Sequence, residues 1–346
     1  MATSSWNAGI IRPVAVAPTG PYQDGAAPGV WTLDQVAFWV KQGLWPSASN
    51  GPAPRGLFGG GSNSGGNSNV IAYVSLASTG NAKDFGDLSL QVFSLASCAS
   101  STRGLFAGGQ SNSSPFYMNT INYVTITTSG NSSSFGDLTQ GRAYVVGCSN
   151  DTRGLFAGGF NGGLVNTIDY VTIASTGNAT DFGDLSTTTQ NMGACASTTR
   201  GVFAGGNVSA GRSSAIRYVT IASTGNSTVF GNLSVITAAL AGCSSATRGL
   251  FAGGSGEYEV ILNTIEYITI ASTGNATYFG DLTVARQSLA ACSSATLGLF
   301  GGGSTGSNTN VIDFVTIATT GNATDFGDLL TATASLAACS GSHGGI

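Results

Sequence analysis

The chain has 346 residues, of which only 8% are charged, and its formal net charge is −4. A chain of this length accommodates one domain of about 290 residues and an N-terminal segment. The absence of any run of Lys or Arg argues against a nucleic-acid partner, and no stretch approaches the roughly 20 apolar residues of a membrane span.

The first 54 residues differ in composition from the rest, because they hold all four tryptophans and seven of the eight prolines. Their start lacks the basic residues and apolar run of a secretory signal, so we expect synthesis in a cytoplasm. The sequence Thr32-Leu-Asp-Gln35 fits a capping box. We therefore predict a short helix over 33–42 that ends at Gly43.

From Arg55 onward the sequence repeats itself six times, which decides the expected fold. Gly-Leu-Phe-Ala-Gly-Gly, with small variations, begins at Gly56, Gly104, Gly154, Gly201, Gly249 and Gly298. Phe-Gly-Asp/Asn-Leu begins at Phe85, Phe135, Phe182, Phe230, Phe279 and Phe326. One cysteine falls in each repeat, at Cys98, Cys148, Cys195, Cys243, Cys292 and Cys339.

Each repeat predicts four strands. Strand A runs through the cysteine, strand B is the Gly-Leu-Phe-Ala-Gly-Gly segment, strand C follows as in 166–174, and strand D as in 179–185. Strand C is an unbroken apolar and Thr run, which is expected when both faces of a sheet are covered. A repeat of four strands and about 48 residues is typical of β-propeller blades.

The two ends of the repeat array predict how the ring closes. The first copy starts at strand B, and the last copy stops after a strand A at 335–340. If this C-terminal strand joins the first blade, six four-stranded antiparallel blades are complete and no open edge remains. We therefore predict an all-β, six-bladed β-propeller over 55–346, preceded by the arm 1–54.

These repeats resemble the kelch motif, in the Gly-Gly doublet that ends strand B and in the aromatics of strands C and D. The resemblance covers 55–346, but strand D has Phe where kelch repeats have Trp. The arginine that often opens kelch strand A occurs only at Arg142 and Arg286. Copper oxidases with kelch-like repeats require histidine ligands, and His343 is the only histidine in the chain.

Length varies at one place in the repeat. From the strand C aromatic to the next Phe-Gly the spacing is always 12 residues, whereas from the Gly-Gly doublet to that aromatic it is 12, 14, 11, 12, 13 and 11. The B–C loops should therefore gather on one face of the disc, opposite the constant turns. Loops on a rigid scaffold often carry recognition, although unconstrained drift in length is an equal alternative. The candidate partner-binding residues in these loops are Phe116, Tyr117, Met118, Phe160, Leu164, Arg212, Glu257, Tyr258 and Glu259.

The arm carries more apolar surface than a short helix can bury by itself. It could fold back on its own propeller, or it could dock on a partner. We favour docking, because the ring closes without the arm. The candidate anchor residues are Trp6, Trp31, Phe38, Trp39 and Trp45.

The recurring polar residues predict structure rather than chemistry. Six cysteines on equivalent strands are expected to be buried free thiols, since neighbouring sheets lie too far apart for disulfides. Asp in each Phe-Gly-Asp should bond nearby amides, and Arg–Asp pairing between strands would explain Arg103, Arg153, Arg200 and Arg248. Sequons such as Asn178-Ala-Thr read as turn chemistry. We predict no metal site, no cofactor and no catalytic set.

A second resemblance concerns 27–46, which includes Trp31, Phe38, Trp39 and Trp45. This stretch, like the Arg-Gly-Leu-Phe-Ala-Gly-Gly repeats, resembles segments of tail-fibre-like structural proteins of tailed bacteriophages. The resemblance implies a virion component, assembled in the host cytoplasm with other virion proteins.

Three functional hypotheses follow. The first is a non-enzymatic tail-fibre or host-adhesion module, anchored by the arm, that binds a host surface glycan or protein as part of a symmetric assembly. The second is a capsid decoration or tail-assembly component without a receptor. An enzyme acting on glycans is the least favoured.

Overall fold

The computed structural model describes residues 5–6, 9–10, 32, 34–35 and 54–345, and the chain divides into two compact units, Met1–Ala53 and Pro54–Ile346. In the first unit β1 (Ser5–Trp6) pairs with β2 (Gly9–Ile10). Thr32 and Gln35 form the expected capping box: the Gln35 amide donates to Thr32 Oγ1 at 3.3 Å, and the Thr32 amide donates to Gln35 Oε1 at 2.9 Å. The remainder of the helix expected over 33–42 lies outside the described residues, apart from helical Asp34 and Gln35.

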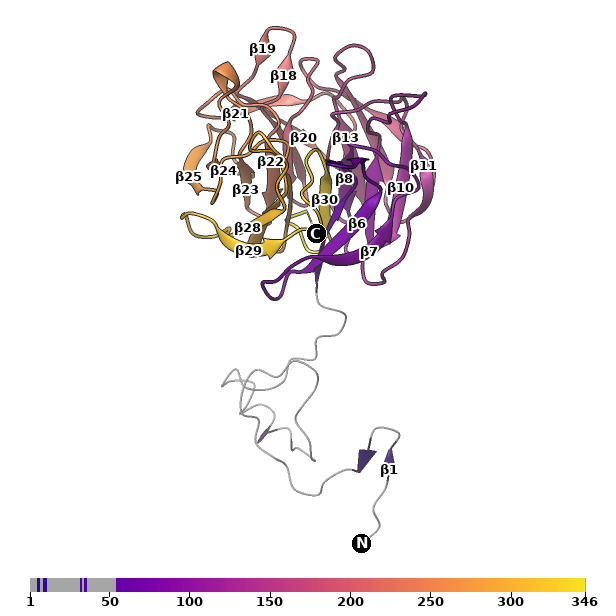
Figure 1. The fold of residues 1–346 in the computed structure, drawn as a ribbon. Coiled ribbons are helices and arrows are strands. Elements are labelled where there is room, and N and C mark those ends of the chain that lie inside the picture. The colour runs from indigo at the N-terminus through magenta and orange to yellow at the C-terminus, as the bar shows by residue number, and fades with distance from the viewer. Residues whose placement is uncertain (1–4, 7–8, 11–31, 33, 36–53, 346) are drawn as a thin grey trace. The chain divides into compact units, whose positions relative to one another are not determined.

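The second unit is a six-bladed β-propeller, as predicted (Figure 1). The A strands are β8 (Ala96–Ala99), β12 (Val146–Ser149), β16 (Gly193–Ala196), β22 (Ala241–Ser244), β26 (Ala290–Ser293) and β30 (Ala337–Ser340). The B strands are β3 (Arg55–Gly59), β9 (Arg103–Ala107), β13 (Arg153–Ala157), β17 (Arg200–Ala204), β23 (Arg248–Ala252) and β27 (Leu297–Gly301).

The two outer strands of each blade complete the sheets. The C strands are β6 (Val70–Ser75), β10 (Thr120–Thr125), β14 (Thr167–Thr172), β20 (Ala215–Thr220), β24 (Thr264–Thr269) and β28 (Val311–Thr316). The D strands are β7 (Lys83–Asp87), β11 (Ser133–Asp137), β15 (Thr180–Asp184), β21 (Thr228–Asn232), β25 (Thr277–Asp281) and β29 (Thr324–Asp328). Every pairing is antiparallel.

The ring closes through the C-terminal strand, as the ends of the repeat array predict. Strand β30 pairs with β3, with Cys339 opposite Leu57, and blade 1 therefore has the order β30-β3-β6-β7. Blades 2 to 6 follow in chain order from β8, β12, β16, β22 and β26. Residues almost 300 positions apart thus share one sheet, which leaves no blade without an inner strand.

The hydrophobic core lies between adjacent blades. One cluster, for example, joins Leu105 and Ile121 of blade 2 to Phe156 and Val171 of blade 3. The strand C aromatic meets the strand D phenylalanine edge to face in every blade, as Tyr123 and Phe135 do with ring centroids 6.0 Å apart. In each C–D pair the register shifts at this phenylalanine, and the bulge accommodates its ring in the core.

The constant turns are held by clasps that recur around the ring. In each D strand the amide of the Asp or Asn after Phe-Gly donates to an asparagine side chain in the next blade's C–D turn, as Asp137 does to Asn178 Oδ1 at 3.1 Å. The adjoining backbone bonds again, since Gly177 donates to the carbonyl of Phe135 at 2.8 Å. The same set joins all six pairs of neighbouring blades. The turn interpretation of Asn178 is confirmed, but the aspartate contributes its backbone rather than a carboxylate bond to nearby amides.

The recurring arginines form a second clasp on the same turns, and the expected Arg–Asp pairing is wrong for them. The guanidinium of Arg153 lies over the ring of Tyr170, 4.9 Å from its centroid, and donates to the carbonyls of Ile221 and Ala222 in the next blade at 3.0 and 2.9 Å. Carbonyls at the end of a strand need donors, and arginine supplies them while covering an aromatic ring. Each of the other clasp arginines also lies over an aromatic ring and donates to carbonyls of the next blade, two for Arg103 and Arg248 and one for Arg55 and Arg200.

The two arginines that resemble those of kelch repeats have a different role. Arg142 pairs with Asp169 at 2.9 Å and Arg286 with Asp313 at 3.0 Å, and all four side chains are fully buried. Each pair joins a D–A connection to a C strand. Removal of one partner would leave the other as an unpaired buried charge, so we assign both pairs a structural role.

Candidate functional site

The B–C loops gather at one end of the propeller, where Figure 1 shows the β18–β19 hairpin at the top. Two of the six loops form hairpins, and a third holds a 3-10 turn, η1 (Glu257–Glu259). The hairpins are β4 (Ser62–Asn63) with β5 (Gly66–Asn67), and β18 (Asn207–Val208) with β19 (Gly211–Arg212). Unlike the clasps of the opposite end, contacts between these loops differ from one blade to the next.

Blades 2 and 3 place three of the expected loop residues together. The Tyr117 and Phe160 rings meet edge to face with centroids 5.7 Å apart, and Leu164 pairs with Phe160 across a β-bridge. Phe116 is exposed beside them, whereas Met118 packs partly buried against the hydrophobic core. Of this group, Met118 therefore contributes to the scaffold rather than to the exposed loop surface.

Blades 4 and 5 bring together the charged loop residues. Arg212 pairs with Glu259 at 2.7 Å and donates to Ser255 Oγ at 3.1 Å. Between the acidic residues of η1, Tyr258 is 92% exposed and has a φ of 55°, a conformation that residues other than Gly and Asn seldom adopt. Glu257 is also exposed. The ion pair to the neighbouring loop thus fixes a turn that projects one tyrosine into solvent.

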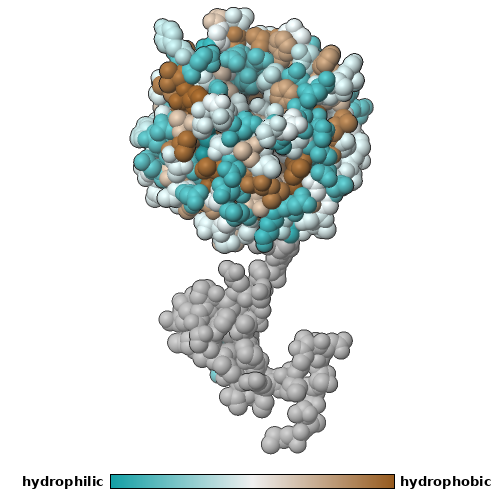
Figure 2. Space-filling view, in the orientation of Figure 1, coloured by the Kyte–Doolittle hydropathy of each residue, from teal (hydrophilic) through white to brown (hydrophobic). Residues whose placement is uncertain are grey.

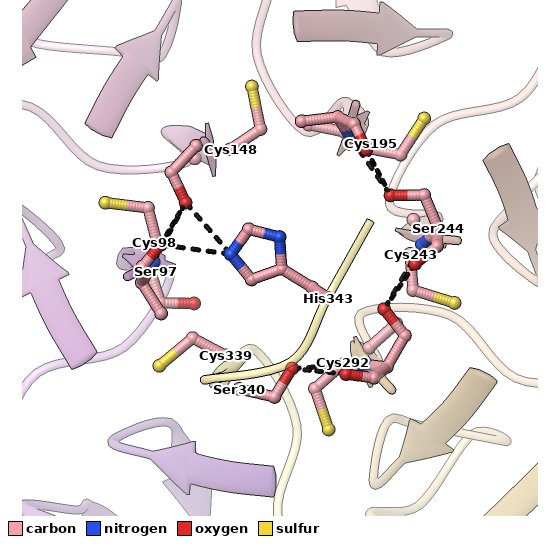
Figure 3. A pocket seen from close by; sticks show the side chains of 18 of the residues that line it. Ser97, Cys98, Cys148, Cys195, Cys243, Ser244, Cys292, Cys339, Ser340 and His343 are labelled. Atoms are coloured by element: carbon pink, nitrogen blue, oxygen red, sulfur yellow. Dashed lines mark hydrogen bonds between the residues drawn. The ribbon is translucent and has the colours of Figure 1, made fainter. Parts of the chain in front are cut away.

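The propeller also contains a central channel, which the repeat pattern does not reveal. Its wall is formed by the A strands, and its middle part has a volume of about 110 Å3. Figure 3 shows the six thiols pointing away from the axis, into the spaces between blades. Burial raises the pKa of the Cys148, Cys243 and Cys339 thiols to about 12. All six cysteines are buried and free, as expected, and carry no thiolate at neutral pH.

The C-terminal segment after β30 lies in one end of this channel. His343 projects into the ring of A strands (Figure 3), where its Nε2 lies 3.0 Å from the carbonyl oxygen of Ala99 and 3.2 Å from Ser149 Oγ. Its Nδ1 accepts a hydrogen bond from the Gly345 amide at 3.0 Å. A Cβ at Gly345 would overlap the Ser149 carbonyl, so the glycines allow the segment to fit. Burial lowers the pKa of His343.

The opposite end of the channel opens among the D–A connections. It is lined by one residue per blade in the left-handed conformation, with φ between 53° and 57°. These residues are Ser94, Tyr144, Asn191, Ala239, Ser288 and Ser335. Each donates its amide to the carbonyl of its counterpart in the neighbouring blade, at 2.8 to 3.2 Å, and the six bonds form a closed ring. We call this ring the channel rim.

The candidate anchor residues fall largely outside the described residues. Only Trp6 has a described backbone, in β1, and Trp31, Phe38, Trp39 and Trp45 are not described. Among the described residues, no group of three His, Cys, Asp or Glu side chains could hold a metal ion. Within the same part of the chain, no helix has the length and apolar character needed to cross a membrane.

Comparison with known proteins assigns the chain to no family, so its classification rests on the fold. No protein-family model matches the chain, and no curated protein is significantly similar to it. The six blades are consistent with kelch-like repeats, whereas the comparisons add no support for the resemblance to phage tail proteins. The fold is compatible with a protein-binding structural module.

Proposed function

We propose that this protein is a non-enzymatic component of a tailed-bacteriophage particle, a tail-fibre or host-adhesion module anchored by residues 1–54. The propeller is displayed with its B–C loops outward, and these loops contact a host surface glycan or protein. The proposal takes its phage setting from the resemblance of 27–46 and of the repeats. Its mechanism rests on the structure of the loops.

One observation supports a recognition role for the B–C loops. The turns of the opposite end are joined by clasps that are nearly the same in every blade, whereas the loops have individual lengths and contacts. They also expose aromatic side chains, Tyr258 at 92% and Phe116 at 56%. Rigid support below variable, partly aromatic loops suits a binding surface, because little conformational entropy is lost on contact.

The anchoring role is tested by deletion of the arm. A chain that begins at Pro54 should fold with the β-sheet circular dichroism of the full chain but should be absent from purified particles. Because all four tryptophans lie before residue 54, tryptophan emission reports the arm alone in the full chain. Incorporation of the deleted protein at the normal copy number would refute the anchor.

The recognition role is tested separately with loop substitutions. Phe116→Ala and Tyr258→Ala should each reduce adsorption of particles to host cells without lowering incorporation. Asp84→Ala is the control, because this exposed residue lies on outer strand β7, away from the loops. If adsorption is unchanged in both loop variants, the loops have no recognition role.

A second candidate function, capsid decoration or tail assembly without a receptor, is favoured by the outer strands of blades 4 and 5. Val229 on β21 is 70% exposed and Tyr278 on β25 is 56% exposed, where blades 1, 3 and 6 have Asp84, Asp181 and Asp325. Apolar residues on otherwise charged sheet edges can mark lateral contacts. Figure 2 shows that apolar residues on the visible side occur in separate patches among polar ones. Val229→Asp should then impair particle assembly but not adsorption.

A further inference from the structure

The open end of the channel is a preformed cavity. It has a volume of about 80 Å3, and its wall includes the whole channel rim. The rim residues hold a backbone conformation that costs energy outside glycine, and the closed ring of hydrogen bonds maintains it. The cavity is therefore rigid before any ligand enters.

The rim has the same backbone conformation in all six blades, and its side chains, apart from Ala239, are polar and uncharged. Hydroxyl and amide groups come from Ser94, Tyr144, Asn191, Ser288 and Ser335. Ala239 and the residue after each rim position give the same cavity an apolar second ring, formed by Leu95, Val145, Met192, Leu240, Leu289 and Leu336. No Lys, Arg, Asp or Glu lines this cavity or the middle part of the channel below it. A charged ligand would find no counter-ion here, whereas a ligand rich in hydroxyl groups would find donors and acceptors.

An aromatic surface adjoins the rim on one side. Tyr144 Oη lies 3.4 Å from Gln110 Oε1, and the residue before it, Ala143, pairs through its backbone with Phe160. Phe160 in turn meets the ring of Tyr117 edge to face. Tyr144 is only partly buried, and burial raises its pKa. The neutral phenol therefore lines the rim and reaches the B–C loop of blade 2 through Gln110.

The far end of the channel is occupied by the chain itself. His343 and the glycines that follow it lie among the A strands at that end. The A strands also form the wall of the middle part, which connects this end to the rim. A ligand at the rim therefore meets a pocket with a protein floor rather than a tube open at both ends. Such a pocket suits one compact unit better than an extended polymer passing through.

We propose that the channel rim binds a single neutral sugar unit of a glycan, with the ring face of the sugar against Tyr144 and its hydroxyls bonded to Asn191 and the rim serines. A pyranose offers hydroxyls around its edge and an apolar face, which matches a polar ring with one aromatic side chain. This inference rests on the proposed adhesion function, and it names the class of its ligand. It also places the contact at the axis, with Tyr117 and Phe160 beside it for the next sugar of the chain.

Titration of the full-length protein with free sugars tests the inference. The probes are glucose, galactose, mannose and N-acetylglucosamine with their disaccharides. Their binding is measured by saturation-transfer NMR and calorimetry. At least one should bind with a Kd of about 1 mM or tighter. Tyr144→Ala and Asn191→Ala should each weaken that binding at least about tenfold, or 1.4 kcal/mol. Both variants should fold, because Ala239 occupies the equivalent rim position with a φ of 56°.

The controls separate this site from the rest of the surface. Asp84→Ala, on outer strand β7, should leave sugar binding unchanged. Absence of binding by every sugar at about 10 mM would overturn the inference, as would binding that survives Tyr144→Ala. Binding only of peptides from the host surface would overturn it too. If no sugar binds but Phe116→Ala or Tyr258→Ala still reduces adsorption, this inference fails and the adhesion function stands. If a sugar binds at the rim but incorporation does not depend on the arm, this inference stands and the proposed anchored module fails.

Discussion

At the scale of single residues, the glycine that opens each B-strand motif and the cysteine of the preceding blade share one contact. A Cβ built on Gly154 would lie 2.5 Å from Cys98 Sγ, and the same contact recurs in all six blades. Two of the most regular features of the sequence therefore have one cause. Glycine is needed because the thiol of the preceding blade fills the space where a side chain would be.

This contact predicts a compensating pair of substitutions. Gly154→Ala should lower the free energy of unfolding by about 1–3 kcal/mol, because the added methyl overpacks a filled site. Combining it with Cys98→Ala should recover a large part of that loss, since alanine removes the sulfur that the methyl meets. Urea unfolding of the wild type, both single variants and the double variant measures the coupling. Strictly additive losses would show that the two residues do not share the space.

His343 provides a second prediction at this scale. Its Nε2 must carry the proton, because the Ala99 carbonyl only accepts, and its Nδ1 accepts from Gly345. The folded chain therefore prefers neutral imidazole, and burial lowers the pKa of His343 below 6.5. Below about pH 6.5 the released segment takes up a proton more readily than the bound one, so acid should weaken its attachment. Above about pH 6.5 the imidazole is neutral in both the bound and the released segment, so a further rise in pH does not strengthen the attachment.

The single histidine makes this measurement direct. The NMR shift of its ring proton should titrate below 6.5 in the native protein, and proteolysis after the last strand should accelerate as the pH falls. His343→Ala should make that proteolysis pH-independent. A titration midpoint at or above 6.5 would contradict the bound neutral ring.

At the scale of elements, the clasps explain why most spacings are constant. Arginine from one B strand and asparagine from the next blade's turn fix the C–D turn, and any change in length would break them. The last B strand departs from the pattern, because Leu297 replaces the arginine and packs against the core beside Phe314. Blade 6 therefore joins blade 1 without this charged clasp.

Replacing another clasp with the same apolar residue tests its value. Arg153→Leu should lower the free energy of unfolding by about 1–2 kcal/mol, since two charge-assisted bonds to carbonyls are lost and leucine recovers only part of the packing. Tyr170→Phe, which keeps the ring and mimics Phe314, is the control and should have little effect. An unchanged urea midpoint in Arg153→Leu would show that the clasp is energetically neutral.

The sequence predicted the blades but not which residues of one blade contact the next. Periodicity places strands, and the incomplete first and last repeats require a shared blade, so the fold and its closure could be derived. The partners of Arg153 could not, because the carbonyls it meets belong to the next blade and lie about 70 positions away in the chain. The same holds for Tyr144 and His343. They acquire neighbours only when six inner strands surround a channel, and no local pattern marks them.

At the scale of the whole molecule, one sheet contains both ends of the repeat array. Strand β30 supplies the inner strand of blade 1 and buries Ala337 and Cys339 in its core. It also leads into the segment that occupies the channel. Closure therefore fixes the rim, the channel floor and the loop face together, and each proposed binding surface depends on it.

Removal of the last strand measures this dependence most directly. Chains ending at Ile346 and at Ala334 are compared by far-UV circular dichroism during urea unfolding. The full chain should unfold the propeller in one cooperative transition, and the shortened chain should lose that transition, because blade 1 opens an edge and its core. A synthetic peptide spanning 333–346 should restore it. An identical transition in the shortened chain would contradict closure by β30 and, with it, the rigid scaffold that the rim and the loops require.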